Sequence, residues 1–242
     1  MLKKASSAGF KTQLADIATW SPPEPVDVIF SNAALQWLSD HTVLFPRLLT
    51  CLASEGILAI QMPAMHNEPV RTLQSIVASS ESWSLQLSGV MSAPPILEPA
   101  AYYDIFSELV SAIEIWIMQY LHVLRGKDPV LQWTMGTSLR PYLDALRPSD
   151  RPEFMAAYSK ALRPHYPPRA DGTVLLPFRR LFIIAKKCRN RVFNGYPQHI
   201  GVPLICNKEL VTRAVSETGP DPRSENRWRF GNSFGRIRVF NG

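Results

Sequence analysis

The sequence predicts an α/β fold built on a parallel sheet. Two apolar runs rich in β-branched residues, 26–30 and 57–62, are typical of buried strands. Apolar residues recur at helical spacing over 40–52, between the two runs, and again around 68–78, after the second run. Strands that alternate with helices in this way favour parallel pairing, with helices covering the sheet.

The boundaries of these first elements carry local signals. Ser31 and Asn32 end the first strand with residues that favour turns. Asp40 is placed to cap the start of the first helix. We expect Glu55 and Gly56 to stop that helix, since glycine is common just past a helix end.

Beyond residue 80 the alternation continues. Residues 80–100 are rich in serine and proline, which is typical of a loop. Pro141 breaks a helical pattern into shorter segments. After the loop we expect, in chain order, a short helix at 102–109, a strand at 113–121, helices at 131–146 and 153–162, a tight turn at 171–172 and a long strand at 173–185.

Composition excludes several classes of protein. Hydrophobic residues make up 46% of the 242 residues, which excludes disorder throughout. No apolar run approaches the roughly 18 residues of a membrane span, and none follows the basic start, so we expect no membrane anchor or secretory signal. Three widely spaced cysteines suit neither a disulfide framework nor a zinc site, and the histidines are isolated. We therefore predict a cytoplasmic protein without a metal site.

Positive charge is concentrated at the end of the chain. Of the net charge of +6, residues 188–242 contribute +5, from nine basic and four acidic residues. This segment has no sustained helical or strand period, and we expect a disordered basic tail. Its pentapeptide at 191–195 recurs at 238–242. Nucleic-acid binding would rest on this tail alone, where aromatic residues interleave with arginines, and we do not expect it.

Five motifs in chain order resemble one enzyme family. They are DVIFSNAALQWL at 27–38, QMP at 61–63, YYDI at 102–105, GTSLRPYL at 136–143 and PFRRLFIIA at 177–185. Together they resemble the trans-aconitate 2-methyltransferases, which are class I S-adenosylmethionine-dependent enzymes. The resemblance runs from about residue 15 to residue 187.

The resemblance implies a Rossmann-like sheet of seven mostly parallel strands. Residues 26–31 correspond to its fourth strand and 57–62 to its fifth, while 112–121 and 173–186 correspond to the last two, the final one antiparallel. Residues 1–122 and 173–187 would then form a partial methyltransferase core. Residues 123–172 would form a helical cap over the substrate, and 188–242 the tail.

The chain departs from the family at the first strands. The family begins with a strand and a glycine-rich turn, followed by an acidic residue on the second strand. No such turn is present here, because Gly9 is the first glycine and Gly56 the next. We therefore expect a truncated sheet that lacks its first strands and leaves the strand at 26–31 as an exposed edge.

The resemblance assigns S-adenosylmethionine to the ends of the early elements. Its binding residues would be Asp16 and Ile17 in a loop, and Ser31, Asn32 and Ala33 after the first strand. Open α/β sheets bind ligands at such strand ends. The residues also have simpler explanations, since Asp16 suits a surface loop or a helix cap, and Ser31 and Asn32 suit a turn.

The resemblance also points to residues that would hold a small polycarboxylate. Arg140 is the first candidate, because its planar guanidinium matches a carboxylate, although an ion pair with Asp144 is an equal alternative. Adjacent Arg179 and Arg180 cannot both face the core of a strand, and we expect a solvated pair. The remaining candidates are Trp37, His41, Tyr103, Tyr120 and Trp133. For the two tryptophans, packing in the core is the better explanation.

Together these interpretations predict methyl transfer from S-adenosylmethionine to a carboxylate of trans-aconitate by a monomeric enzyme. No residue is needed as a general base, because a carboxylate is already ionised near neutral pH. We expect the truncation to impair the activity. The alternatives are a catalytically inactive methyltransferase-like interaction module, with the basic tail as its binding arm, or a fragment of a mis-annotated gene.

Overall fold

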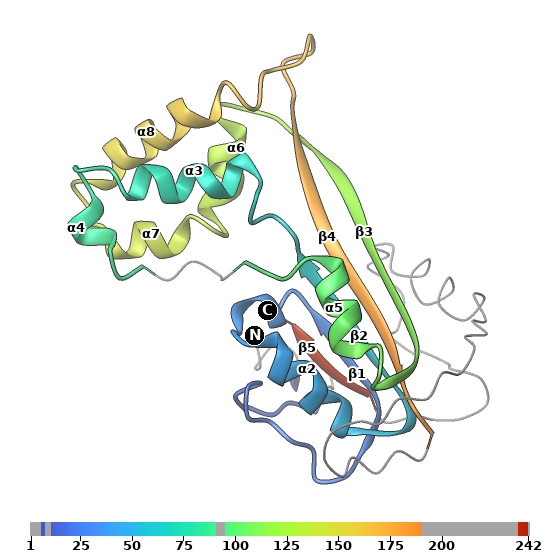
Figure 1. Cartoon of the computed structure of the whole chain (residues 1–242). Helices are drawn as coiled ribbons and strands as arrows, with labels where there is room; N and C mark the ends of the chain where they lie inside the picture. Colours follow the sequence, from blue (N-terminus) through green and yellow to red (C-terminus); the bar gives the residue numbers. More distant parts are fainter. Residues whose placement is uncertain (1–5, 8–10, 91–94, 190–236, 242) are drawn as a thin grey trace.

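A computed structural model describes residues 6–7, 11–90, 95–189 and, for the backbone, 237–241. One sheet of five strands, in the order β3-β4-β2-β1-β5, runs through it (Figure 1). The strands are β1 Val26–Asn32, β2 Leu52–Pro63, β3 Val110–Leu124, β4 Val174–Lys187 and β5 Ile237–Asn241. The helices are η1 Leu35–Trp37, α2 His41–Thr50, α3 Pro69–Ala78, α4 Ser84–Leu87, α5 Pro99–Phe106, α6 Pro129–Met135, α7 Arg140–Ala145 and α8 Arg151–Leu162.

The strand directions confirm the predicted α/β class. β1 and β2 pair in parallel, and α2 lies between them in the chain. β4 runs antiparallel to both β2 and β3, as the resemblance implied for the final strand of the core. Methyltransferase-type Rossmann-like architecture therefore accounts for this order of strands.

The start of β2 differs from the prediction. Asp40 caps α2 as expected, since its side chain accepts a hydrogen bond from the backbone N–H of Val43. The helix, however, ends at Thr50, and β2 begins at Leu52. The predicted helix stop at 55–56 is instead an irregularity in the pairing of β1 with β2. Glycine suits position 56, because a Cβ would crowd the carbonyl oxygens of Ala53 and Asp27, at 3.0 and 3.1 Å.

β5 corrects the expectation of an entirely disordered tail. Residues 237–241 pair in parallel with β1, from Val28 opposite Ile237 to Asn32 opposite Asn241. The unpaired backbone groups of β1 explain this pairing, because a sheet edge is a template for any extended segment. Local sequence gave no sign of it. Residues 190–236 and 242, with the first copy of the repeat and the aromatic–arginine stretch, lie outside the described residues.

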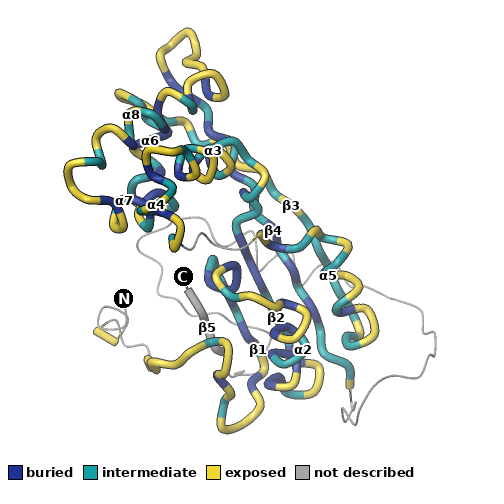
Figure 2. Tube along the Cα trace, turned by 60° about the vertical axis from the view of Figure 1, so that its left-hand side comes forward, coloured by how far each residue is buried: buried dark blue, intermediate teal, exposed yellow. Residues whose placement is uncertain are grey.

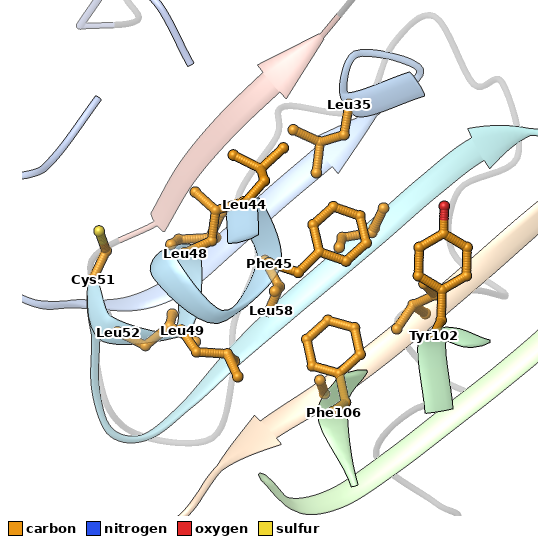
Figure 3. Close-up of a cluster of buried hydrophobic side chains, with 14 of the residues drawn as sticks. Leu35, Leu44, Phe45, Leu48, Leu49, Cys51, Leu52, Leu58, Tyr102 and Phe106 are labelled. Carbon is orange, nitrogen blue, oxygen red and sulfur yellow. The ribbon is translucent and has the colours of Figure 1, made fainter. Parts of the chain in front are cut away.

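Two hydrophobic clusters form the interior. In the first, α2 and α5 cover one face of β1, β2 and β4. Phe45 of α2 stacks between Tyr102 and Phe106 of α5, with ring centroids 5.4 and 5.6 Å apart (Figure 3). The second cluster joins five helices, α3, α4, α6, α7 and α8, and we call these the helical unit. Figure 2 shows buried residues along the strands and on the inner sides of these helices.

The helical unit is larger than the predicted cap. We expected the helix at 68–78 to cover the sheet, but α3 packs against α8 instead. Buried Gln74 of α3 donates hydrogen bonds to the hydroxyl groups of Tyr158 and Ser138. The Tyr158 hydroxyl in turn donates to the carbonyl of Val70, 2.7 Å away. Residues 65–90 therefore belong with 123–172, and the predicted loop at 80–100 contains α4.

The pairing of β3 with β4 connects the two clusters. It extends from Val110 opposite Lys187 to Leu124 opposite Val174. Leu181, Ile183 and Ala185 of β4 belong to the first cluster, which we call the sheet cluster, whereas Val174, Leu176 and Phe178 of the same strand pack against the helical unit in the second cluster. This long antiparallel pair, whose strands are joined through α6, α7 and α8, holds the helical unit beyond the carboxyl ends of β1 and β2 (Figure 1).

His41 is a structural residue at the first turn of α2. Its Nε2–H donates to the carbonyl of Leu35 at 3.0 Å, and Nδ1 accepts from the Tyr102 hydroxyl at 2.7 Å. The Tyr102 oxygen also accepts from the backbone N–H of Leu97. Both ring nitrogens are thus occupied inside the core, and His41 is not free to bind substrate as predicted. Burial lowers the pKa of His41, which keeps the ring neutral.

Deleting residues 237–242 is expected to expose the outer edge of β1. Backbone amides of β1 that pair with β5 then exchange with solvent more rapidly. Hydrogen exchange followed by mass spectrometry should show faster deuteration of peptides covering 26–32, with unchanged rates in α8. Equal protection of β1 in both chains would contradict the pairing.

His41→Gln is expected to flatten the pH dependence of stability. The unfolded chain binds a proton on this ring near pH 6.5, whereas the folded chain does so only at lower pH. The stabilisation is therefore present above about pH 6.5 and is lost as the pH falls. The variant should lose about 1–2 kcal/mol at pH 7.5, because its partners lose hydrogen bonds. Urea unfolding between pH 7.5 and 5 measures both effects.

His165→Gln is the matched control, since His165 is exposed. It should keep the wild-type pH dependence of the free energy of unfolding. A His41→Gln profile parallel to that of the wild type would show that His41 is not buried as a neutral ring.

Candidate functional site

The carboxyl ends of β1 and β2 form one edge of the sheet. Ligands of open α/β sheets bind outside this edge. Ser31 and Asn32 end β1, and Ala33 turns the chain there with a positive φ of 52°. The N–H of Ala33 donates to the carbonyl of Gln61 at 2.9 Å, which ties the turn to β2. Three of the predicted cofactor residues therefore lie together at this edge.

Three residues at or next to this edge have a buried polar atom without a partner among the described residues, and Ser31 and Gln61 lie on opposite faces of the sheet. Among the described residues, no group accepts from or donates to Ser31 Oγ, Gln36 Oε1 or Gln61 Nε2. These side chains are at most 7% exposed. Leaving such an atom unpaired costs about 1–3 kcal/mol, so buried polar groups nearly always find partners. A bound ligand can supply the missing hydrogen bonds at this edge.

Arg47 fixes the loop that carries the other two predicted cofactor residues. Its guanidinium on α2 donates to the carbonyls of Ile17 and Trp20, at 2.7 and 2.5 Å. Asp16 is exposed, and its Oδ1 accepts from the N–H of Ala18 at 2.9 Å. The carboxylate therefore stabilises its own turn.

A second group of functional residues lies where β3 and β4 pass from the sheet to the helical unit. Arg180 donates to Oε1 of buried Gln61 at 2.9 Å. Its guanidinium carbon lies 4.8 Å from the ring centroid of Phe178 and 5.8 Å from that of Tyr120. The ring of Trp133 packs on Phe178 with 5.3 Å between centroids. We call Gln61, Tyr120, Trp133, Phe178 and Arg180 the Arg180 cluster.

In the described part of the chain, Arg180 differs from adjacent Arg179 in having no acidic partner. Within the described residues, no carboxylate lies within 4.0 Å of its guanidinium. Adjacent Arg179 points to the other face and lies 3.9 Å from Glu68. Together with His66 and Glu98, Arg179 lines a shallow pocket beside α5. The predicted solvated pair is thus two arginines with separate surroundings.

The remaining predicted substrate residues lie apart from this cluster. Arg140, at the start of α7, is exposed and pairs with Asp144 at 3.6 Å, which is the alternative that the sequence left open. Trp37 in η1 and Tyr103 in α5 are about half exposed, at 51% and 49%. No ring contact or ion pair of the described residues joins them to Arg180. Tyr120 and Trp133, by contrast, are brought together within the cluster.

Sequence reasoning missed Gln36, Gln61 and Arg180. The sequence did contain a signal for Arg180, because side chains of a strand such as PFRRLFIIA at 177–185 alternate between the two faces of the sheet. If Leu181 and Ile183 face one core, Arg180 shares the opposite face with Phe178. A glutamine inside an apolar strand, as at position 61, also points to a buried polar contact. No group of metal-binding side chains and no membrane-length apolar helix occurs in the described parts of the chain.

Comparison with known proteins identifies the family. No family model matches the sequence. The trans-aconitate 2-methyltransferase of Methylobacterium radiotolerans is 42% identical over 177 residues, which cover 72% of this chain and 68% of the relative. The enzyme of that name from Azoarcus sp. is 41% identical, covering 71% and 67%, and that from Agrobacterium fabrum is 36% identical, covering 77% and 74%.

Among solved structures, the YcgJ protein of Bacillus subtilis aligns with 78% of this chain and 76% of its own, at 13% identity and a TM-score of 0.45. The matched part of this chain thus spans about two thirds to three quarters of its curated relatives. At this identity and coverage, the chain belongs to the trans-aconitate 2-methyltransferase family.

Proposed function

We propose that this chain transfers a methyl group from S-adenosylmethionine to a carboxylate of trans-aconitate, giving a monomethyl ester. Family membership supports the reaction. The observation on this chain that supports it best is the Arg180–Gln61 pair, which adjoins the carboxyl ends of β1 and β2. A cation that has no acidic partner among the described residues and lies beside a ligand-binding edge suits an anionic substrate.

The residues at the β1 edge fit the methyl donor. Ser31 Oγ and Gln36 Oε1 are buried and unpaired among the described residues, so they can bond to polar groups of a nucleoside or amino acid. Asn32, Ala33 and the loop at Asp16 and Ile17 would surround them. S-adenosylmethionine, when bound, supplies an electrophilic methyl group on a sulfonium. The chain's own residues hold and orient the two reactants.

In this scheme the protein accelerates the reaction by positioning the two reactants and by excluding water from them. The acceptor carboxylate titrates near pH 4 and is ionised at neutral pH, so no general base is required. Placing its oxygen in line with the methyl group converts an encounter between two molecules into an oriented step. A carboxylate that has lost its bound water is a more reactive nucleophile. The helical unit would cover the site and exclude water from it.

The same proposal includes a substrate class, an oligomeric state and a cellular location. The substrate would be a small polycarboxylate, bound by a monomer in the cytoplasm without a nucleic-acid partner. Positive charge near the site attracts such an anion. The helical unit would act as the predicted cap over the substrate.

A direct assay tests this function. Purified full-length chain incubated with S-adenosylmethionine and trans-aconitate should yield S-adenosylhomocysteine and a product 14 mass units heavier than the acid, as expected for one methyl ester. Citrate and cis-aconitate serve as comparison acids. Folded protein that binds S-adenosylhomocysteine but gives no ester with any acid would support the inactive interaction module instead.

Ser31→Ala separates ligand binding from folding. Because Ser31 Oγ has no partner in the described protein, its removal should leave the melting temperature unchanged or slightly raised. The dissociation constant for S-adenosylhomocysteine should rise about 2- to 10-fold, as for one lost hydrogen bond. Isothermal titration calorimetry measures it. An unchanged affinity would remove Ser31 from the cofactor site.

A further inference from the structure

The side chains of Arg180 and Gln61 leave unused donors on one face of the sheet. Gln61 is 4% exposed, and its Oε1 already accepts from Arg180 Nη1 at 2.9 Å. Its Nε2 has no acceptor among the described residues. The guanidinium offers further N–H groups, with no carboxylate within 4.0 Å in the described chain. Among the described residues, the pair therefore has donors and positive charge without a matching acceptor.

The surroundings hold the guanidinium in place without neutralising it. Phe178 and Tyr120 contact its carbon at 4.8 and 5.8 Å from their ring centroids. Aromatic faces attract the cation and fix its plane, but they supply no hydrogen-bond acceptor. A planar fork held in this manner matches the two oxygens of a carboxylate.

The pair also lies next to the edge where the methyl donor would bind. Gln61 is opposite Asn32 in the parallel register of β1 with β2, so the two side chains share one face. The Gln61 carbonyl accepts from the N–H of Ala33. A carboxylate bound by both Arg180 and Gln61 would therefore lie beside β2, the strand next to β1.

We propose that Arg180 and Gln61 form a carboxylate-binding subsite for the substrate, in which the guanidinium and the amide Nε2–H both donate to one carboxylate group. The inference rests on the proposed function for the identity of the acid. The subsite itself is assigned from donors, charge and packing, and it replaces Arg140 as the main anchor of the acid.

Three variants distinguish binding from structure. Arg180→Gln removes the charge, and Arg180→Lys keeps the charge but loses the planar fork. Gln61→Glu adds a carboxylate that pairs with Arg180 inside the protein and repels a bound acid. It should therefore keep or raise the melting temperature while it weakens binding. Arg147→Gln is the matched control, because Arg147 is an exposed arginine of the helical unit paired with Asp150.

The test uses the full chain and tricarballylate, a saturated tricarboxylate, in isothermal titration calorimetry, together with trans-aconitate methylation kinetics. Wild type and Arg147→Gln should bind equally. Arg180→Gln and Gln61→Glu should bind about 10- to 100-fold more weakly, and Arg180→Lys should lie between. KM for trans-aconitate should rise by similar factors, while affinity for S-adenosylhomocysteine stays unchanged.

The outcomes separate this subsite from the proposed function. If the wild type binds tricarballylate and Gln61→Glu binds it equally well, the subsite is wrong even where methylation succeeds. If the wild type binds tricarballylate but methylates no acid, and the variants lose that binding, the subsite stands and the methylation proposal fails. Failure of the folded wild type to bind tricarballylate or trans-aconitate would overturn the subsite.

Discussion

The antiparallel pairing of β3 with β4 is the constraint on which the rest of the structure depends. One strand, β4, supplies Leu181 and Ile183 to the sheet cluster and Leu176 and Phe178 to the helical unit. Because this one strand contributes side chains to both clusters, the helices cannot shift relative to the sheet without disrupting the pairing of β3 with β4. The position of the helical unit beyond the β1 and β2 ends is therefore set by a continuous ladder of backbone hydrogen bonds.

The candidate site lies where that strand changes its surroundings. Arg180 follows the last residue that β4 gives to the helical unit and precedes the first that it gives to the sheet cluster. At such a junction neither core covers the guanidinium completely, so a charged side chain is tolerated next to buried residues. The same junction adjoins Gln61 and the turn at Ala33. A charged acid and a methyl donor can thus meet at one edge of the sheet.

Sequence alone predicted the parts of the fold that local pattern determines. The apolar runs at 26–30 and 57–62 are strands, and Asp40 caps α2. The antiparallel direction of the final core strand was implied by the family resemblance and not by local pattern. The partner of α3 and the pairing of β5 with β1 were not predictable, because both depend on surfaces distant in sequence. The candidate site likewise combines residues that local pattern located and residues that depend on contacts distant in sequence. Strand ends located Ser31 and Asn32, whereas the surroundings of Arg180 required the register of three strands.

The most direct test of the account is a crystal structure of the full chain with S-adenosylhomocysteine and trans-aconitate. The account predicts that the nucleoside lies at the carboxyl end of β1, with a polar atom within hydrogen-bond distance of Ser31 Oγ. It also predicts that one carboxylate of the acid lies within about 3 Å of both Arg180 and Gln61 Nε2. An acid bound at Arg140 or in the pocket beside Arg179, with Arg180 left without a ligand, would contradict it.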